Sequence, residues 1–271
     1  MTIGVFVALT ASLYPVGMWL VYRLGSATPL MLSVGAAAVL TCLLTNKGLG
    51  TLGWSWGRWQ DHWLSYLLPL GYVAVAYGTI WALDLGGWYD VAFVHELRQS
   101  FSLSQWGDGQ VVGLQFALTA SISFLGLLPS VLGEELGWRG LLVPELSRIM
   151  PFGGVALTSG ALWALWHWPL IVMGLYGSPV TPLWFRLLFF TLGIMSMSVV
   201  MTDLRLRTQS LWSAVVLHMS HNVFLQKFFV PMTDEYSRSA WWVDEFGAVL
   251  PLTIGLVALH YWRNDRTAFA P

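Results

Sequence analysis

The chain has 271 residues, of which 56% are hydrophobic and 10% are charged, whereas roughly 25% are charged in an ordinary soluble domain. This balance excludes a soluble globular protein, and 17 tryptophans add side chains that favour the membrane interface. The formal net charge of −1 lacks the basic surplus that nucleic acid binding requires, so no nucleic acid partner is expected.

Eight apolar runs follow one another along the chain, and a helix needs about 20 such residues to cross the hydrocarbon core. They cover residues 3–22, 29–44, 64–83, 111–132, 155–175, 183–201, 210–229 and 246–261. Backbone groups inside a bilayer must form hydrogen bonds within their own segment, so these runs predict helices. The sequence therefore predicts an all-α polytopic membrane protein, with about eight transmembrane helices in one integral membrane domain over residues 1–271.

A short additional helix is expected over residues 134–148, between the fourth and fifth runs. It has carboxylates at its start and Arg148 near its end, as the helix dipole favours, and Pro129 and Pro151 separate it from its neighbours. Gly133 and Gly137 form a small-xxx-small pattern, which predicts close packing against another helix.

The distribution of basic residues predicts the orientation. With eight crossings both termini share one side, and that side receives eight of the 13 Lys and Arg residues. The positive-inside rule then places both termini in the cytoplasm, with the protein in the cell membrane.

Two adjacent glutamates interrupt the apolar sequence near its midpoint, and ionisable side chains at membrane depth usually mark function. Glu135 and Arg139 are four positions apart and can form an ion pair on one helix face. Glu134 points about 100° away and stays free. A carboxyl group in an apolar pocket has a raised pKa, which suits it to accept a proton from water near neutral pH. Glu134 is therefore a candidate general base, and the alternative is that both glutamates only cap the short helix.

Histidines in two of the apolar runs are further candidates. His167 lies about two thirds of the way along the fifth run, as a catalytic group or a packing residue. His218 and Asn222 share one helix face, with His221 on the adjoining edge, and could donate two hydrogen bonds to an oxyanion. Hydrogen bonding between helices is the competing explanation for this pair. His167, His218 and a glutamate could also bind a catalytic zinc ion, although the sequence contains no H-E-x-x-H.

Three motifs lie in order on successive predicted helices: Glu134-Glu135-x-x-x-Arg139, Trp163-x-x-x-His167 and His218-x-x-x-Asn222. They resemble the motifs of the CAAX-processing type II and bacteriocin-processing (CPBP, or Abi) intramembrane endopeptidases. The resemblance covers about residues 130–225, which are expected to be the catalytic core. The second motif commonly begins with Phe in this family, and Trp163 takes that place here.

The resemblance implies a core of eight helices with the catalytic groups in a cavity open to the cytoplasm. It implies that Glu134 and His167 activate water and that His218 and Asn222 stabilise the oxyanion. Glu135 and Arg139 would hold the motif helix in place. The expected reaction is hydrolysis of a peptide bond in a membrane-associated peptide or protein, lipidated or not, without a cofactor.

Three alternatives remain open at this stage. One is a zinc-dependent version of the same peptidase. Another is a membrane scaffold or bacteriocin-immunity protein that binds a partner without cleaving it. The last is a small transporter in which buried Glu and His residues relay protons.

Overall fold

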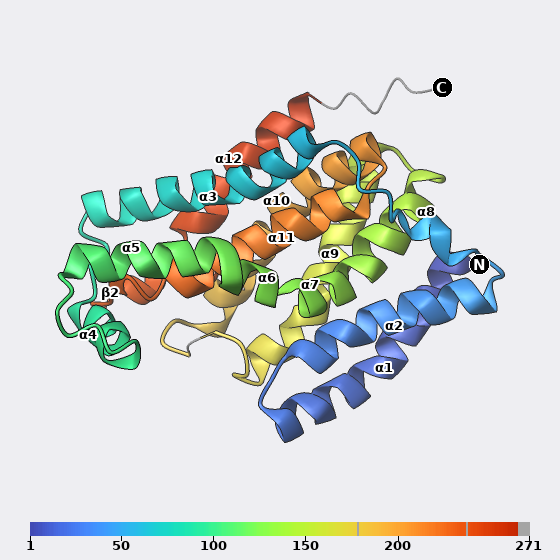
Figure 1. The fold of residues 1–271 in the computed structure, drawn as a ribbon. Helices are drawn as coiled ribbons and strands as arrows, with labels where there is room; N and C mark the ends of the chain where they lie inside the picture. The colour runs from blue at the N-terminus through green and yellow to red at the C-terminus, as the bar shows by residue number, and fades with distance from the viewer. Residues whose placement is uncertain (178, 237, 265–271) are drawn as a thin grey trace.

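The computed structural model describes residues 1–177, 179–236 and 238–264, and the ordered elements in these ranges are almost all helices (Figure 1). The only strands in the described ranges are β1 (Gly87–Trp88) and β2 (Thr233–Asp234), which pair antiparallel with Gly87 opposite Asp234. The predicted all-α class is confirmed.

Each of the eight predicted runs corresponds to a helix. These helices are α1 (Thr2–Leu24), α2 (Thr28–Leu44), α3 (Trp59–Ala82), α5 (Asp108–Leu118), α9 (Phe152–Val172), α10 (Leu183–Thr208), α11 (Leu211–Phe224) and α12 (Val249–Arg263). Helix α5 continues through the π-helical turn η2 (Thr119–Ser123) into α6 (Phe124–Gly126), and α11 continues into the π-helical turn η4 (Leu225–Phe229).

Five of the described helices are long and apolar enough to cross a membrane: α1, α3, the combined helix over residues 108–126, α9 and α10. The other three, α2, α11 and α12, have 17, 14 and 15 residues. The short connecting elements are η1 (Leu49–Leu52), α4 (Val91–Ser100) and η5 (Ser239–Trp241). The chain is therefore a polytopic membrane protein, as predicted.

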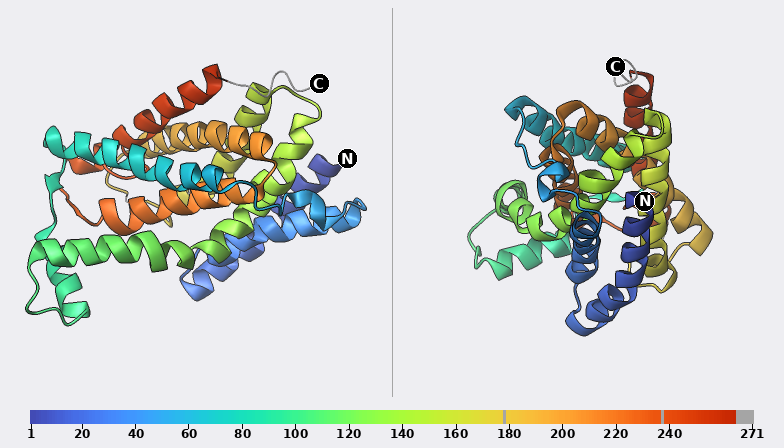
Figure 2. Two further views of the ribbon diagram at one scale, coloured as in Figure 1. Left: turned by 45° about the horizontal axis from the view of Figure 1, so that its top comes forward. Right: turned by 90° about the vertical axis from the view of Figure 1, so that its right-hand side faces the viewer.

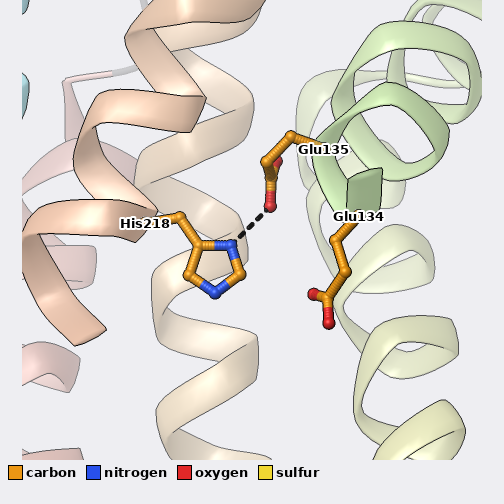
Figure 3. A group of neighbouring side chains, drawn as sticks. All are labelled: Glu134, Glu135 and His218. Carbon is orange, nitrogen blue, oxygen red and sulfur yellow. Dashed lines mark hydrogen bonds and ion pairs between the residues drawn. The ribbon is translucent and has the colours of Figure 1, made fainter. Parts of the chain in front are cut away.

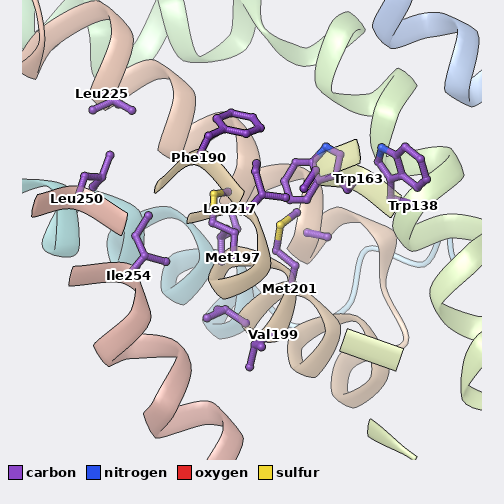
Figure 4. Close-up of a cluster of buried hydrophobic side chains, with 14 of the residues drawn as sticks. Trp138, Trp163, Phe190, Met197, Val199, Met201, Leu217, Leu225, Leu250 and Ile254 are labelled. Atoms are coloured by element: carbon purple, nitrogen blue, oxygen red, sulfur yellow. The ribbon is translucent and has the colours of Figure 1, made fainter. Parts of the chain in front are cut away.

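Helices α9, α10 and α11 lie in the interior of the bundle, and the other long helices pack around them (Figures 1 and 2). Helix α10 packs against α9, α11 and α12, and α11 also packs against α3. The α1–α2 hairpin packs against residues 128–142, which carry the Glu-Glu motif. Side chains from the interior helices form the centre of the core, including Trp163, Phe190, Met201 and Leu217 (Figure 4). Because α9 and α11 both pack on α10, their side chains meet next to the Glu-Glu motif, as Trp163 and His218 do.

The motif helix differs from its prediction. Its glutamates lie at the carboxyl end of α7 (Leu128–Glu135), and the helix continues through the π-helical turn η3 (Leu136–Leu142) into α8 (Val143–Ser147). Glu134 and Glu135 are therefore well inside a helical stretch, where the dipole of a helix N-terminus does not explain them. The expected breaks are present, since α7 starts next to Pro129 and α8 ends before Pro151. Wide π turns of this kind are frequent at functional sites.

The close packing predicted for Gly133 and Gly137 is confirmed, and the partner is α2. A Cβ atom on Gly137 would lie 2.5 Å from Cγ1 of Val34, and one on Gly133 would lie 3.0 Å from the Cα of Leu32. Because neither glycine has a Cβ atom, the backbone of α2 can lie directly against the motif helix. The hairpin thereby covers one side of the motif helix.

Candidate functional site

A cavity of about 470 Å³ opens inside the bundle and is lined by residues of α1, α2, α7, α9, α10 and α11. All four predicted catalytic residues line it: Glu134, His167, His218 and Asn222. They come from three helices that are far apart in sequence, and the structure places all four side chains in the lining of one cavity. Most of the remaining lining is apolar.

Glu134 and His167 face each other across part of this cavity. The Glu134 side chain is 1% exposed, its Oε2 accepts a hydrogen bond of 3.0 Å from Nε1 of Trp163, and its Oε1 lies 4.0 Å from Nε2 of His167. The Nδ1 of His167 lies 3.0 Å from the Trp163 carbonyl oxygen. A carbonyl oxygen only accepts, so Nδ1 carries a hydrogen. In the neutral form of the ring, Nε2 then has a lone pair, which is directed toward Glu134. The 4.0 Å gap is too long for a direct hydrogen bond and suits a bridging water molecule.

Glu135 forms the second polar group of the motif, and its predicted ion pair with Arg139 is confirmed. Its Oε1 accepts from Nη1 of Arg139 at 3.0 Å and lies 2.9 Å from Nδ1 of His218. Figure 3 shows both glutamates leaving the same helix toward the one that carries His218. The side chains of Glu135 and Arg139 are 0% exposed. Because Glu135 holds His218 through Nδ1, the other ring nitrogen remains for the cavity.

Trp163 connects these groups, a role that the sequence did not reveal. Besides its bonds to Glu134 and His167, its ring lies 4.0 Å from the guanidinium carbon of Arg139 and packs edge-on against His218 at 5.2 Å between centroids. A phenylalanine at this position could make the ring contacts and the backbone hydrogen bond, but it has no N–H to donate to Glu134. Trp163 thus supplies Glu134 with a donor that the common Phe of the second motif lacks.

Under the peptide hydrolysis that the motif resemblance implies, replacing Trp163 with Phe is expected to lower the cleavage rate roughly 10- to 100-fold, because a hydrogen bond to a charged group contributes roughly 1.5–3 kcal/mol. Turnover of a fluorogenic peptide by the purified protein measures this. The matched control is Trp168→Phe on the same helix, which removes an N–H bond of the same 3.0 Å length to Thr191 outside the cavity lining. Equal activity of the two variants would contradict the role of the Trp163 N–H.

Asn222 and His221 complete the polar lining from α11. Asn222 lies one helical turn after His218, so both side chains can reach the same point in the cavity. His221 is 5% exposed, and its Nδ1 lies 2.8 Å from the hydroxyl oxygen of Tyr72 on α3. Tyr72 belongs to no motif, and only the packing of α3 against α11 reveals this contact.

The residues fit a metal ion poorly. Glu134, Glu135 and His218 offer ligand atoms that all lie within 4.8 Å of one another, and this donor set is one that zinc accepts. However, Arg139 places a fixed positive charge on Glu135 Oε1, and the same oxygen is bonded to His218. The other carboxylate oxygen, Oε2, is buried without a hydrogen-bond partner, and a divalent cation bound there would be repelled by the charge of Arg139 beside it. His167, which belonged to the predicted zinc set, is not part of this trio.

The outer end of the cavity lies away from the chain termini. This end is lined by exposed residues 25–27, in the loop between α1 and α2, and by Tyr176 after α9. This loop lies at the opposite end of α1 from Thr2, and Trp262 near the end of α12 packs against Phe152, at the opposite end of α9 from Tyr176. The termini and the outer end of the cavity therefore lie at opposite ends of the bundle. The cytoplasmic placement of the termini and of the opening stays a prediction.

Comparisons with known proteins agree with the motifs. Residues 116–224 match the family described as type II CAAX prenyl endopeptidase Rce1-like. The chain is 33% identical over 106 residues to CAAX prenyl protease 2 of Methanococcus maripaludis. That similarity covers 38% of this chain and 38% of the length of the relative, and it leaves most of both chains unmatched. The matched residues 116–224 contain all three motifs, so both comparisons support the resemblance predicted from them, and this segment is similar to the Rce1-like type II CAAX prenyl endopeptidases.

Proposed function

We propose that this protein is an intramembrane endopeptidase that hydrolyses a peptide bond in a membrane-associated peptide or protein, using water activated by Glu134 and His167. One observation carries the proposal. The Oε1 of Glu134 and the lone pair on Nε2 of His167 are 4.0 Å apart, in a buried cavity that they share with His218 and Asn222. Two proton acceptors at this separation can hold one water molecule between them.

In this mechanism the bound water loses a proton to the Glu134–His167 pair as its oxygen attacks the substrate carbonyl carbon. The carbonyl oxygen becomes an oxyanion, which accepts hydrogen bonds from the Asn222 amide and from Nε2–H of His218. Because Nδ1–H of the same ring donates to Glu135, this step uses the doubly protonated, cationic form of His218. Such preorganised donors contribute a large share of the rate in acyl transfer. The C–N bond then breaks, and the proton held by the pair passes to the leaving amine.

Glu135 and Arg139 support this arrangement without touching the substrate. The Glu135 carboxylate orients His218 through Nδ1 and is itself held by Arg139. A buried carboxylate with two donors on one oxygen has little freedom to rotate, so the ring of His218 keeps a single orientation. The oxyanion donor is thereby fixed before the substrate binds.

The substrate that we propose is a membrane-associated peptide or protein with a prenylated CAAX-type tail. The named relative is a CAAX prenyl protease, and the cavity carries apolar side chains such as Leu170, Phe190 and Met197 beside the polar groups. A thioether-linked isoprenyl chain would bury apolar surface against such a lining. Purified protein in lipid nanodiscs should cleave a farnesylated CAAX peptide, with the products identified by mass spectrometry. A binding scaffold or a transporter would leave the peptide intact.

Metal removal separates the proposed mechanism from its zinc version. Because the positive charge of Arg139 lies against the Glu135 carboxylate and disfavours a second cation there, dialysis against a zinc chelator is expected to leave the cleavage rate within about twofold of the untreated rate. Loss of activity on chelation, and recovery on adding zinc, would replace side-chain activation of water with metal activation. The chelator itself is controlled by adding it already saturated with zinc.

A further inference from the structure

The catalytic cavity has a second polar group that belongs to none of the three motifs. Glu245 lies just before α12 and lines the same cavity, together with Tyr176 and Gln226. Its Oε1 accepts a hydrogen bond of 2.7 Å from Nε2 of Gln226, and its Oε2 accepts a hydrogen bond from the Tyr176 hydroxyl. Both oxygens are thus held in place by neutral donors, and each keeps a further lone pair.

The Glu245 carboxyl group lines the same cavity as the catalytic residues but makes its hydrogen bonds to other side chains. The Tyr176 ring, which holds Glu245, has its centroid 5.9 Å from the ring of His167, and Phe190 packs against both rings at 5.7 Å and 5.2 Å. The rings of Tyr176, Phe190 and His167 therefore form one aromatic group, which reaches from His167 to the Tyr176 hydroxyl that binds Glu245. A peptide bound with its scissile bond at Glu134 and His167 would place a neighbouring side chain at Glu245.

The charge of Glu245 is not compensated by the protein. Among residues 1–177, 179–236 and 238–264, no lysine or arginine forms an ion pair with it, whereas Glu135, Asp61 and Glu145 each have one. Desolvation by burial raises the pKa of Glu245, and this outweighs the lowering by its hydrogen bonds to Tyr176 and Gln226 and by the nearby His218. Leaving a carboxylate unpaired in a partly buried site is costly unless a ligand brings the missing charge.

We infer that Glu245, held by Tyr176 and Gln226, is a specificity site that binds a cationic side chain of the substrate next to the scissile bond. A lysine ammonium or an arginine guanidinium would supply donors to the free lone pairs of both oxygens. The inference rests on the proposed peptidase function, and it narrows the substrates to those with a basic residue near the cleavage point.

The test uses farnesylated CAAX peptides that differ only in having lysine or its neutral analogue norleucine at each position flanking the cleavage site in turn. At one of these positions the wild-type protein is expected to cleave the lysine peptide with a kcat/KM roughly 10- to 100-fold higher, the range of a charge-assisted hydrogen bond. Glu245→Gln should bring this ratio close to one while norleucine peptides are still cleaved.

A second variant protects the test against misfolding of the first. Gln226→Lys places an ammonium group beside Glu245 and should also abolish the preference for lysine, because the protein then supplies the cation itself. A wild-type ratio close to one at every position, or an unchanged ratio in both variants, would overturn the inference while the peptidase proposal stands. Failure of wild-type protein to cleave any of the peptides would overturn both.

Discussion

Glu134→Gln is expected to lower peptide cleavage by roughly 10²- to 10⁴-fold, the usual contribution of a general base. The amide keeps the shape of the side chain and can still contact Trp163, but it cannot take a proton from water. The KM should change little, because Glu134 acts on water and not on the substrate. Initial rates over a range of peptide concentrations, with wild-type protein in the same nanodiscs, separate kcat from KM.

The matched control for this variant is Glu145→Gln on α8. Glu145 forms an ion pair of 2.9 Å with Lys47 and does not line the cavity. Its replacement removes one carboxylate of the same kind from the same helical segment, so full activity is expected. If Glu134→Gln were as active as Glu145→Gln, the water-activation mechanism would be refuted, and a scaffold or transporter would become the better explanation.

Arg139→Met is expected to destabilise the fold by about 3–5 kcal/mol and to abolish cleavage. Removing one partner of a buried ion pair leaves the other charge uncompensated, and that penalty is of this size. Glu135 is 0% exposed and has no access to water. The same change releases the carboxylate that orients His218. The unfolding midpoint of the intact protein in one detergent, together with the cleavage rate, measures both effects.

Arg148→Met is the control for the stability measurement. Arg148 also pairs with a glutamate, at 3.6 Å, but its side chain is 67% exposed. Surface pairs of this kind contribute about 0–1 kcal/mol. Adding Glu135→Gln to Arg139→Met should restore part of the stability without restoring activity, since the unpaired charge is then gone. An Arg139→Met protein as stable as Arg148→Met would show that the pair does not hold the motif helix.

Several features followed from the sequence because they depend on local spacing. The apolar runs gave the helices, and the four-residue spacing of Glu135 and Arg139 gave their ion pair. The three motifs gave the family resemblance. The position of the glutamates within their helix was predicted wrongly. Acidic residues after a proline usually indicate the start of a helix, but here the helix begins at Leu128, six residues before Glu134.

Other features depended on contacts between distant segments. The hydrogen bond from Trp163 to Glu134, the pairing of His221 with Tyr72 and the binding of Glu245 by Tyr176 each join residues on different elements. No periodicity connects such positions, so sequence spacing could not have found them. The relation between the termini and the cavity likewise became visible only when the helices were placed together.

The sequence by itself determined that this protein lies in a lipid bilayer, where its helices are and which side chains are candidates for catalysis. The length of an apolar run and the cost of burying a charge act on each segment separately. The tertiary structure decided which of those groups meet. The 4.0 Å between Glu134 and His167 exists because glycines let α2 approach the motif helix and because α9 packs beside it. That distance depends on side-chain packing across the whole bundle, and no single segment encodes it.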